Sequence, residues 1–221
     1  MRKRLLAGCA APVMIFCATP IFAETGDFGV SVKAGSLGAG AELSKPLGVK
    51  FSIGLGVNSY NYKTAKTESN IDYDMKFELQ SVSLLASYHP FGGVFRLTGG
   101  ALYNNNELKL DGKPTAGSIY NINGVTYTAS QVGTLTGTLT FNKTAPYLGI
   151  GWGNRPGSKL GLTADIGVLY QGSPSLALSA TGALSDPALA SDLEQERKSA
   201  ESDLGNFKWY PVLSVGLYFR F

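Results

Sequence analysis

Charged side chains set among apolar, alternating segments are the residues best able to do chemistry in this chain. They carry both signs and occupy the positions opposite to the apolar ones: Lys33, Glu42, Lys50, Glu78, Arg96, Asp165 and Arg220. If the apolar positions face lipid, these side chains face an interior, where buried charges must pair or become neutral. They form either a salt-bridge network that plugs the interior or a constriction that selects zwitterionic or charged solutes. A narrow barrel, whose side chains can fill the bore, favours the plug.

Catalytic residue patterns are absent from the sequence. His89 is the only histidine, beside Pro90 in a predicted turn, whereas a membrane hydrolase would need this residue at the opposite rim. We find no metal-ligand spacing and no nucleotide-binding loop. The glycine-rich residues 149–153 are interpreted as strand residues that relieve crowding in a curved sheet. We therefore predict neither an enzyme nor a cofactor.

The final stretch, residues 207–221, gives the clearest structural signal. Its apolar residues fall on every second position: Leu213, Val215, Leu217, Phe219 and Phe221. This alternation predicts a β-strand, and the run is longer than the ~9–11 residues that a tilted strand needs to cross a bilayer. The aromatic end resembles the C-terminal signature of Gram-negative outer-membrane barrels. That resemblance implies that Leu217, Phe219 and Phe221 are an insertion signal for the barrel-assembly machinery.

Residues 1–23 predict a cleaved signal peptide, which leaves residues 24–221 as one outer-membrane barrel. Three basic residues precede an apolar segment, and Ala23 is a small residue at the cleavage position. A lipoprotein box ending at Cys9 is the alternative, but its apolar region is shorter than the ~7–15 residues expected. The remaining chain has equal numbers of basic and acidic residues and no cysteine. We therefore expect no nucleic-acid partner and no disulfide.

Alternating apolar residues predict an all-β fold, an eight-stranded antiparallel transmembrane β-barrel. The predicted strands cover residues 28–34, 37–43, 49–62, 71–88, 95–103, 133–152, 160–170 and 207–221. The apolar parity changes at Gly35-Ser36, which fits either a tight turn or a bulge in one long strand, giving eight or seven strands. An even strand number is usual in bacterial barrels and favours the turn. A second parity change, near Gln80-Ser81, predicts a bulge, and a third lies around Pro146.

Loop lengths predict the orientation of the barrel. Short turns at Pro46, Pro90 and Pro156 lie on one side, and long polar segments at 63–70, 111–132 and 181–205 on the other. Outer-membrane barrels place short turns in the periplasm and long loops outside. Aromatic residues at the strand ends predict two interfacial girdles. They are Tyr60, Tyr62, Tyr73, Tyr103, Tyr170 and Trp209 near the loops, and Tyr88, Phe91, Phe95, Trp152 and Phe221 near the turns.

Two of the long loops carry local structure signals. An Asn-Gly pair within residues 120–127 predicts a small hairpin. In residues 185–205, Asp186 stands as a cap before Pro187, and an apolar stripe follows. This segment predicts a short amphipathic helix in the last extracellular loop.

Several stretches, taken together, resemble the CarO-like outer-membrane proteins, a family of small eight-stranded barrels. They are residues 70–75, 89–92, 123–127, 141–151, 165–174 and 208–212. The resemblance implies a monomer in the Gram-negative outer membrane, surrounded by lipid and lipopolysaccharide, and uptake of basic and small amino acids. The leading hypothesis is a porin-like route for small polar solutes. The alternative is a non-conducting barrel that acts through its extracellular loops.

Overall fold

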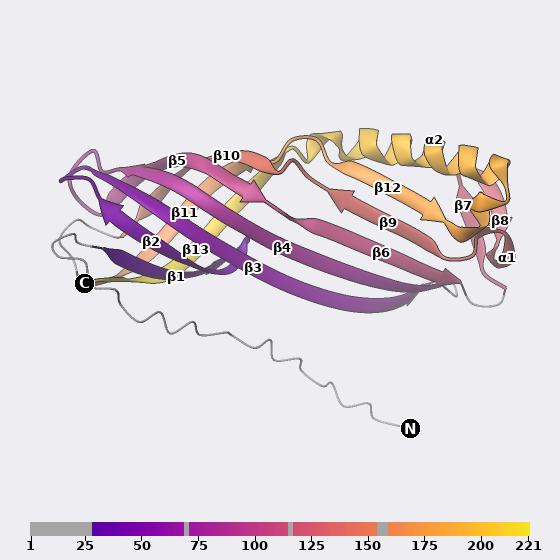
Figure 1. The fold of residues 1–221 in the computed structure, drawn as a ribbon, viewed down its shortest axis with the longest axis horizontal. Coiled ribbons are helices and arrows are strands. Elements are labelled where there is room, and N and C mark those ends of the chain that lie inside the picture. The colour runs from indigo at the N-terminus through magenta and orange to yellow at the C-terminus, as the bar shows by residue number, and fades with distance from the viewer. Residues whose placement is uncertain (1–27, 69–70, 115–116, 154–158) are drawn as a thin grey trace, which may run out of the picture.

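The structure, a computed structural model, describes residues 28–68, 71–114, 117–153 and 159–221 (Figure 1). The proposed signal peptide and the turn at Pro156 lie outside the described residues, so both stay predictions. Among the helices that the structure describes, none is long and apolar enough to cross a membrane.

Eight antiparallel strands form a closed barrel. In ring order they are β1 (Gly29–Gly35), β2 (Gly38–Pro46), β3 (Phe51–Glu68), β4 (Ile71–Tyr88), β5 (Phe95–Asn104), β10 (Thr144–Trp152), β11 (Leu160–Tyr170) and β13 (Trp209–Arg220). The ring closes because β4 pairs with β5 and β13 pairs with β1. Gly35 lies opposite Gly38, so the ambiguous N-terminal segment is a hairpin of two strands. The predicted all-β fold class is confirmed.

Apolar side chains cover the outer surface of this barrel. Leu162, Ile166 and Leu217 are 76%, 51% and 59% exposed, which places them outside the barrel and not in a dry core. Aromatic residues border this belt at both ends of the strands. At the end that carries residues 47–50 and 89–94 (the turn end), Phe95 stacks edge-on against Trp152 with ring centroids 5.8 Å apart. At the opposite end (the loop end), Tyr170 and Trp209 are 4.7 Å apart.

A five-stranded sheet continues from the barrel at the loop end. It consists of the outer parts of β3 and β4 together with β6 (Glu107–Pro114), β9 (Leu135–Thr140) and β12 (Ser175–Ala180). We call this sheet the extension. Figure 1 shows β3 and β4 running without a break from the barrel into it. The predicted single strand 133–152 is therefore two strands, β9 in the extension and β10 in the barrel.

The bulge predicted at Gln80-Ser81 is wrong, and so is the loop predicted at residues 63–70 as far as residue 68, because residues 69 and 70 lie outside the described residues. The β3–β4 register is continuous from the Phe51–Tyr88 pair to the Glu68–Ile71 pair. The apolar parity changes because the environment changes along one regular strand. In the barrel, the apolar side chains of β4 point outward to the belt. In the extension they point to the other face, where Tyr73 packs against a buried cluster.

The tip of the extension is a small hairpin, as predicted. Strands β7 (Ile119–Ile122) and β8 (Val125–Thr128) are joined by Asn123 and Gly124, whose φ values of 53° and 77° suit a tight hairpin turn. A short helix, α1 (Ala129–Val132), follows. Side chains from the hairpin, α1, β12 and the next helix form the buried cluster: Tyr120, Ile122, Tyr127, Val132, Ala180, Leu189 and Leu193.

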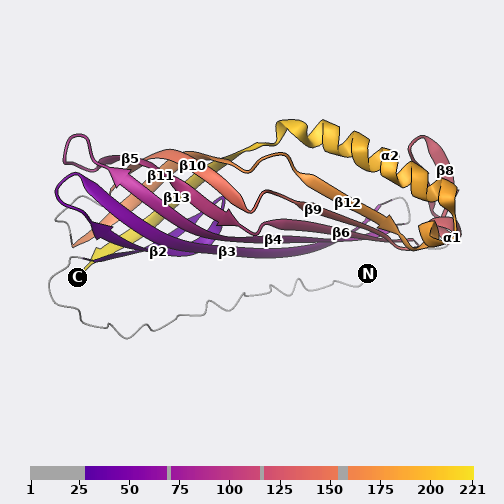
Figure 2. The same cartoon turned by 45° about the horizontal axis from the view of Figure 1, so that its top comes forward.

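Helix α2 (Pro187–Asp203) lies along the extension, between the short 3-10 helices η1 (Thr181–Leu184) and η2 (Leu204–Asn206) (Figures 1 and 2). The Asp186 side chain accepts hydrogen bonds from the backbone N–H groups of residues 188 and 189 and caps the helix. Glu201 accepts a hydrogen bond from the Leu176 N–H at 2.8 Å and so occupies the edge of β12. Tyr127 donates to Asp192, which raises the pKa of Tyr127 to about 12. The predicted helix in the last loop is confirmed.

Candidate functional site

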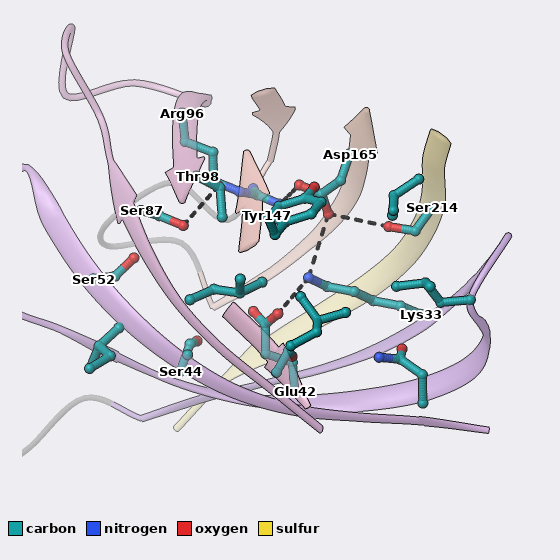
Figure 3. A pocket seen from close by; sticks show the side chains of 18 residues that line it. Lys33, Glu42, Ser44, Ser52, Ser87, Arg96, Thr98, Tyr147, Asp165 and Ser214 are labelled. Atoms are coloured by element: carbon teal, nitrogen blue, oxygen red, sulfur yellow. Dashed lines mark hydrogen bonds and ion pairs between the residues drawn. The ribbon is translucent and has the colours of Figure 1, made fainter. Parts of the chain in front are cut away.

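A chain of ion pairs crosses the barrel lumen. Lys33 Nζ lies 2.8 Å from Glu42 Oε2 and 3.5 Å from Asp165 Oδ2. The second oxygen of Asp165 accepts from Arg96 Nη2 at 2.5 Å, and Arg96 Nη1 donates to the Gly153 carbonyl at 2.9 Å. The four side chains come from β1, β2, β5 and β11, so this ion-pair cluster connects opposite walls (Figure 3). Its carboxylates and cations balance in number, as buried charges require.

Glycine makes room for the strongest of these pairs. Gly151 lies between Arg96 and Asp165, because it pairs with Arg96 on β5 and with Asp165 on β11. A Cβ atom at this position would lie 2.3 Å from Asp165 Oδ1 and 2.8 Å from Arg96 Nε. The two side chains therefore meet across a strand that offers no side chain of its own. This supports the interpretation of Gly149 and Gly151 as strand glycines, whereas Gly153 follows β10 with a φ of 97°.

A small cavity remains beside the ion-pair cluster. Its volume is about 60 Å³, and hydroxyl groups border it together with the four charges (Figure 3). Ser87 and Thr98 share a hydrogen bond of 3.0 Å, and Ser214 donates to Asp165 at 3.4 Å. Sites for organic ligands usually measure roughly 300–1,000 Å³. The cavity holds a few water molecules at most and has no room for an amino acid.

An apolar layer lies across the lumen on the loop-end side of the ion-pair cluster. Its buried members are Leu102, Ala145, Tyr147, Leu169 and Val212, and Leu37, Leu85 and Tyr210 pack against them. Leu102 and Leu169 are 2% and 1% exposed, so their side chains are shielded from water. Tyr210 donates to the Ser36 carbonyl at 2.6 Å and ties this layer to the β1–β2 turn. The alternation in the sequence did not predict this layer, although its residues occupy the same inward-facing alternate positions as the lumen charges.

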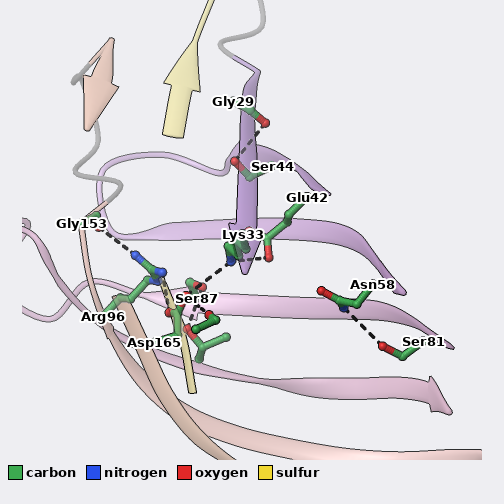
Figure 4. Close-up of polar contacts among 12 residues, drawn as sticks. Gly29, Lys33, Glu42, Ser44, Asn58, Ser81, Ser87, Arg96, Gly153 and Asp165 are labelled. Carbon is green, nitrogen blue, oxygen red and sulfur yellow. Dashed lines mark hydrogen bonds and ion pairs between the residues drawn. The ribbon is translucent and has the colours of Figure 1, made fainter. Parts of the chain in front are cut away.

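The structure brings together four of the predicted lumen charges, Lys33, Glu42, Arg96 and Asp165 (Figure 4). Arg220 is buried at the turn end, opposite Gly29, and does not line the cavity. Lys50 lies exposed in the turn after β2.

Glu78 does not face the lumen, so its predicted place in the lumen network is wrong. It lies on the outer face of the extension, 2.7 Å from Lys76 and 3.8 Å from Lys109. Because β4 keeps one register, position 78 shares the outward parity of the belt residues. The hydrogen bond from Lys76 lowers the pKa of Glu78, and the charges of Lys109 and Lys63 act in the same direction.

Several solved structures of outer-membrane proteins resemble this fold. The crystal structure of CarO2 from Acinetobacter baumannii is similar, with a TM-score of 0.60 at 24% identity over 88% of this chain and 98% of that chain. CarO from the same organism gives a TM-score of 0.58 at 21% identity over 87% and 97%. The fold is that of the CarO barrels. No protein-family model and no curated protein matches the chain.

The CarO-like fold leaves the C-terminal residues on the outer surface. Leu217, Phe219 and Phe221 are all exposed, and the Phe219 and Phe221 rings lie 6.2 Å apart. Their side chains therefore lie on the same outer face as the apolar belt. That these three residues form an insertion signal stays a prediction.

His89 should make the stability of the barrel depend on pH. Its side chain is buried in the β4–β5 turn, and Nδ1 lies 3.1 Å from the Gly93 carbonyl. Burial lowers the pKa of His89, and the charge of Arg96 lowers it further. Below about pH 6.5, the ordinary pKa of histidine, His89 becomes protonated in the unfolded chain but stays neutral in the folded barrel. The free energy of unfolding should therefore fall as the pH decreases from 7.5 to 5.5.

Urea unfolding in detergent micelles measures this pH dependence. The His89→Gln variant is the control, because glutamine does not titrate, and its unfolding free energy should change less over the same interval. Equal pH dependence of the two proteins would contradict the prediction.

Proposed function

We propose that this protein is an integral outer-membrane barrel that does not conduct in its resting state and that acts through its extension. The exposed apolar belt between two aromatic borders suits a bilayer. The short turns and the long segments lie at opposite ends, which in outer-membrane barrels correspond to the periplasm and the outside. The extension then stands on the cell surface.

The observation that carries this proposal is the double closure of the lumen. The ion-pair cluster bridges the walls, and the apolar layer seals the side toward the extension. An apolar constriction excludes ions and water because no group in it replaces their hydration. A solute would have to displace both layers in succession. The extension, in contrast, has its own buried cluster, which gives it a defined shape for contacts with a partner.

Permeability measurements test the closed lumen. Liposomes containing the purified protein should swell in glycine, lysine or glutamate no faster than protein-free liposomes, and planar bilayers should show no conductance steps. Solute-specific swelling above the protein-free rate would overturn the proposal.

Passage of small zwitterionic solutes is the second candidate function, and the mixed charges around the cavity favour it. In that case wild-type protein should conduct amino acids. Replacement of Lys33 and Arg96 by glutamine should then change the preference between lysine and glutamate.

Removal of the extension tests its role at the surface. Short linkers in place of residues 105–143 and 172–207 would remove all of the extension except the outer parts of β3 and β4, and would leave the eight barrel strands intact. The truncated protein should still fold, shown by faster migration of unheated samples in gels, but cells that carry it should lose adhesion to surfaces or proteins that wild-type cells bind. Unchanged adhesion would contradict a role of the extension.

A further inference from the structure

A groove opens on the outer face of the barrel, where the extension begins. Its volume is about 470 Å³, and residues 57–59, 80–82, 103 and 105 line it. The groove lies at the interruption between β5 and β6. There Asn105 donates its N–H to the Gln80 carbonyl at 2.8 Å, and the Asn106 side chain accepts the Gln80 N–H at 3.0 Å. The sheet thus stays closed behind the groove.

The groove changes from apolar to polar along the strands. Val57, Val82 and Tyr103 lie side by side across three strands and are 54%, 45% and 56% exposed, so they continue the apolar belt. The next outward-facing row contains Ser59 and Gln80, with Asn105 beside them. An occupant that fits this surface is itself amphipathic, with an apolar part toward the belt.

Lysines border the polar side of the groove. Lys143 donates to the side chain of Asn105 at the rim. Beyond it, Lys63, Lys76 and Lys109 lie directly opposite one another across β3, β4 and β6. Like charges in such positions repel each other. In the two rows nearest the groove, these four lysines lie near two glutamates, Glu78 and Glu107, whereas the next row of the same face carries Asp74 opposite Asp111.

The lysine row lies farther along the strands than the apolar part of the groove. Lys63 lies six residues beyond Val57, which is about 20 Å along a strand and less in height because barrel strands are tilted. Lysine side chains bend back toward a membrane surface while their methylene stems stay on the protein. The ammonium groups can therefore bend from the lysine row toward the groove.

We propose that this groove is a binding site for lipopolysaccharide. An acyl chain lies on Val57, Val82 and Tyr103, and phosphates of the headgroup region bind Lys143 and the lysine row. Free phosphate would gain nothing from the apolar floor, whereas a phosphorylated lipid uses both parts. The choice of this lipid rests on the proposed outer-membrane location, because the loop end then meets the outer leaflet, whose phosphate-rich lipid is lipopolysaccharide.

Native mass spectrometry of the full protein in detergent, titrated with Kdo2-lipid A, tests the site. The wild-type protein should form a one-to-one adduct. The variant Lys76→Glu/Lys109→Glu/Lys143→Glu should bind at least tenfold more weakly. Its matched control is Lys45→Glu/Lys50→Glu/Lys159→Glu, with three lysines at the turn end, which should bind like wild type. Heat-dependent gel migration verifies that each variant folds. If Lys76→Glu/Lys109→Glu/Lys143→Glu does not fold, the variant with glutamine at the same three positions takes its place.

Competing ligands identify the source of the phosphate. Dephosphorylated lipid A should bind weakly, and inorganic phosphate at millimolar concentration should not displace Kdo2-lipid A. Equal binding of Kdo2-lipid A by the wild-type protein and by the variant with glutamate at positions 76, 109 and 143 would overturn the proposal. Full displacement of Kdo2-lipid A by inorganic phosphate would overturn it as well. Because binding is measured in micelles, such a failure leaves the outer-membrane location untouched. Cell fractionation tests that location separately.

Discussion

Replacement of Asp165 by alanine should lower the free energy of unfolding by about 3–5 kcal/mol, the usual cost of removing one partner of a buried ion pair. Asp165 is the carboxylate that connects both cations of the cluster. Without it, Lys33 keeps Glu42, but Arg96 keeps only the Gly153 carbonyl among its described partners. A guanidinium that is 4% exposed then lacks a counter-charge. Urea unfolding of the protein in detergent micelles measures the loss.

A more exposed ion pair on the same chain provides the matched control. Glu78 lies 2.7 Å from Lys76, as close as the lumen pairs, but on the outer face of the extension. The Glu78→Ala change should cost much less than Asp165→Ala, because water screens exposed pairs. The double variant Arg96→Met/Asp165→Leu should recover most of the stability lost in Asp165→Ala. Equal losses at residues 165 and 78 would show that the lumen cluster is not effectively buried.

Alternation in the sequence was sufficient to predict the barrel and half of the candidate site. The outward face of β11 and β13 is uniformly apolar, so parity alone assigned Asp165 to the lumen. The same rule failed at Glu78. There the strand continues past the belt, and the apolar side chains move to the opposite face although the register does not change. Alternation along a strand predicts which residues share a face of the sheet, but it does not predict what that face contacts.

The extension could not be predicted from periodicity for a related reason. Residues 63–68 are polar, and a polar segment between apolar strands is usually a loop. They form a strand because β4 has enough residues to pair with them and because β6, β9 and β12 complete the sheet. These pairings join segments far apart in the chain. Local signals were sufficient only where the structure is local, as at the Asn123-Gly124 turn and the Asp186 cap.

Substitution of valine for Gly151 should be nearly as destabilising as loss of Asp165, with an unfolding free energy lower by about 3 kcal/mol, the lower range for breaking a buried pair. The new Cβ would lie 2.3 Å from Asp165 Oδ1, so the carboxylate must move away from Arg96. The ion pair then opens inside a space too small to hydrate both groups, since the adjoining cavity is only about 60 Å³. The same urea unfolding experiment measures this loss.

A double-mutant cycle shows whether the loss arises from the ion pair. In the Arg96→Met/Asp165→Leu background, where no ion pair remains to be broken, Gly151→Val should cost much less than in the wild type, because coupled neighbours are not additive. Gly161→Val is the positional control: this glycine lies at the turn end of β11, and a Cβ there meets no atom within 4 Å. Its substitution should change stability little. If Gly151→Val costs the same in both backgrounds, the glycine serves only strand curvature. Otherwise, the absent side chain at residue 151 is what allows Arg96 and Asp165 to meet across a strand and close the lumen.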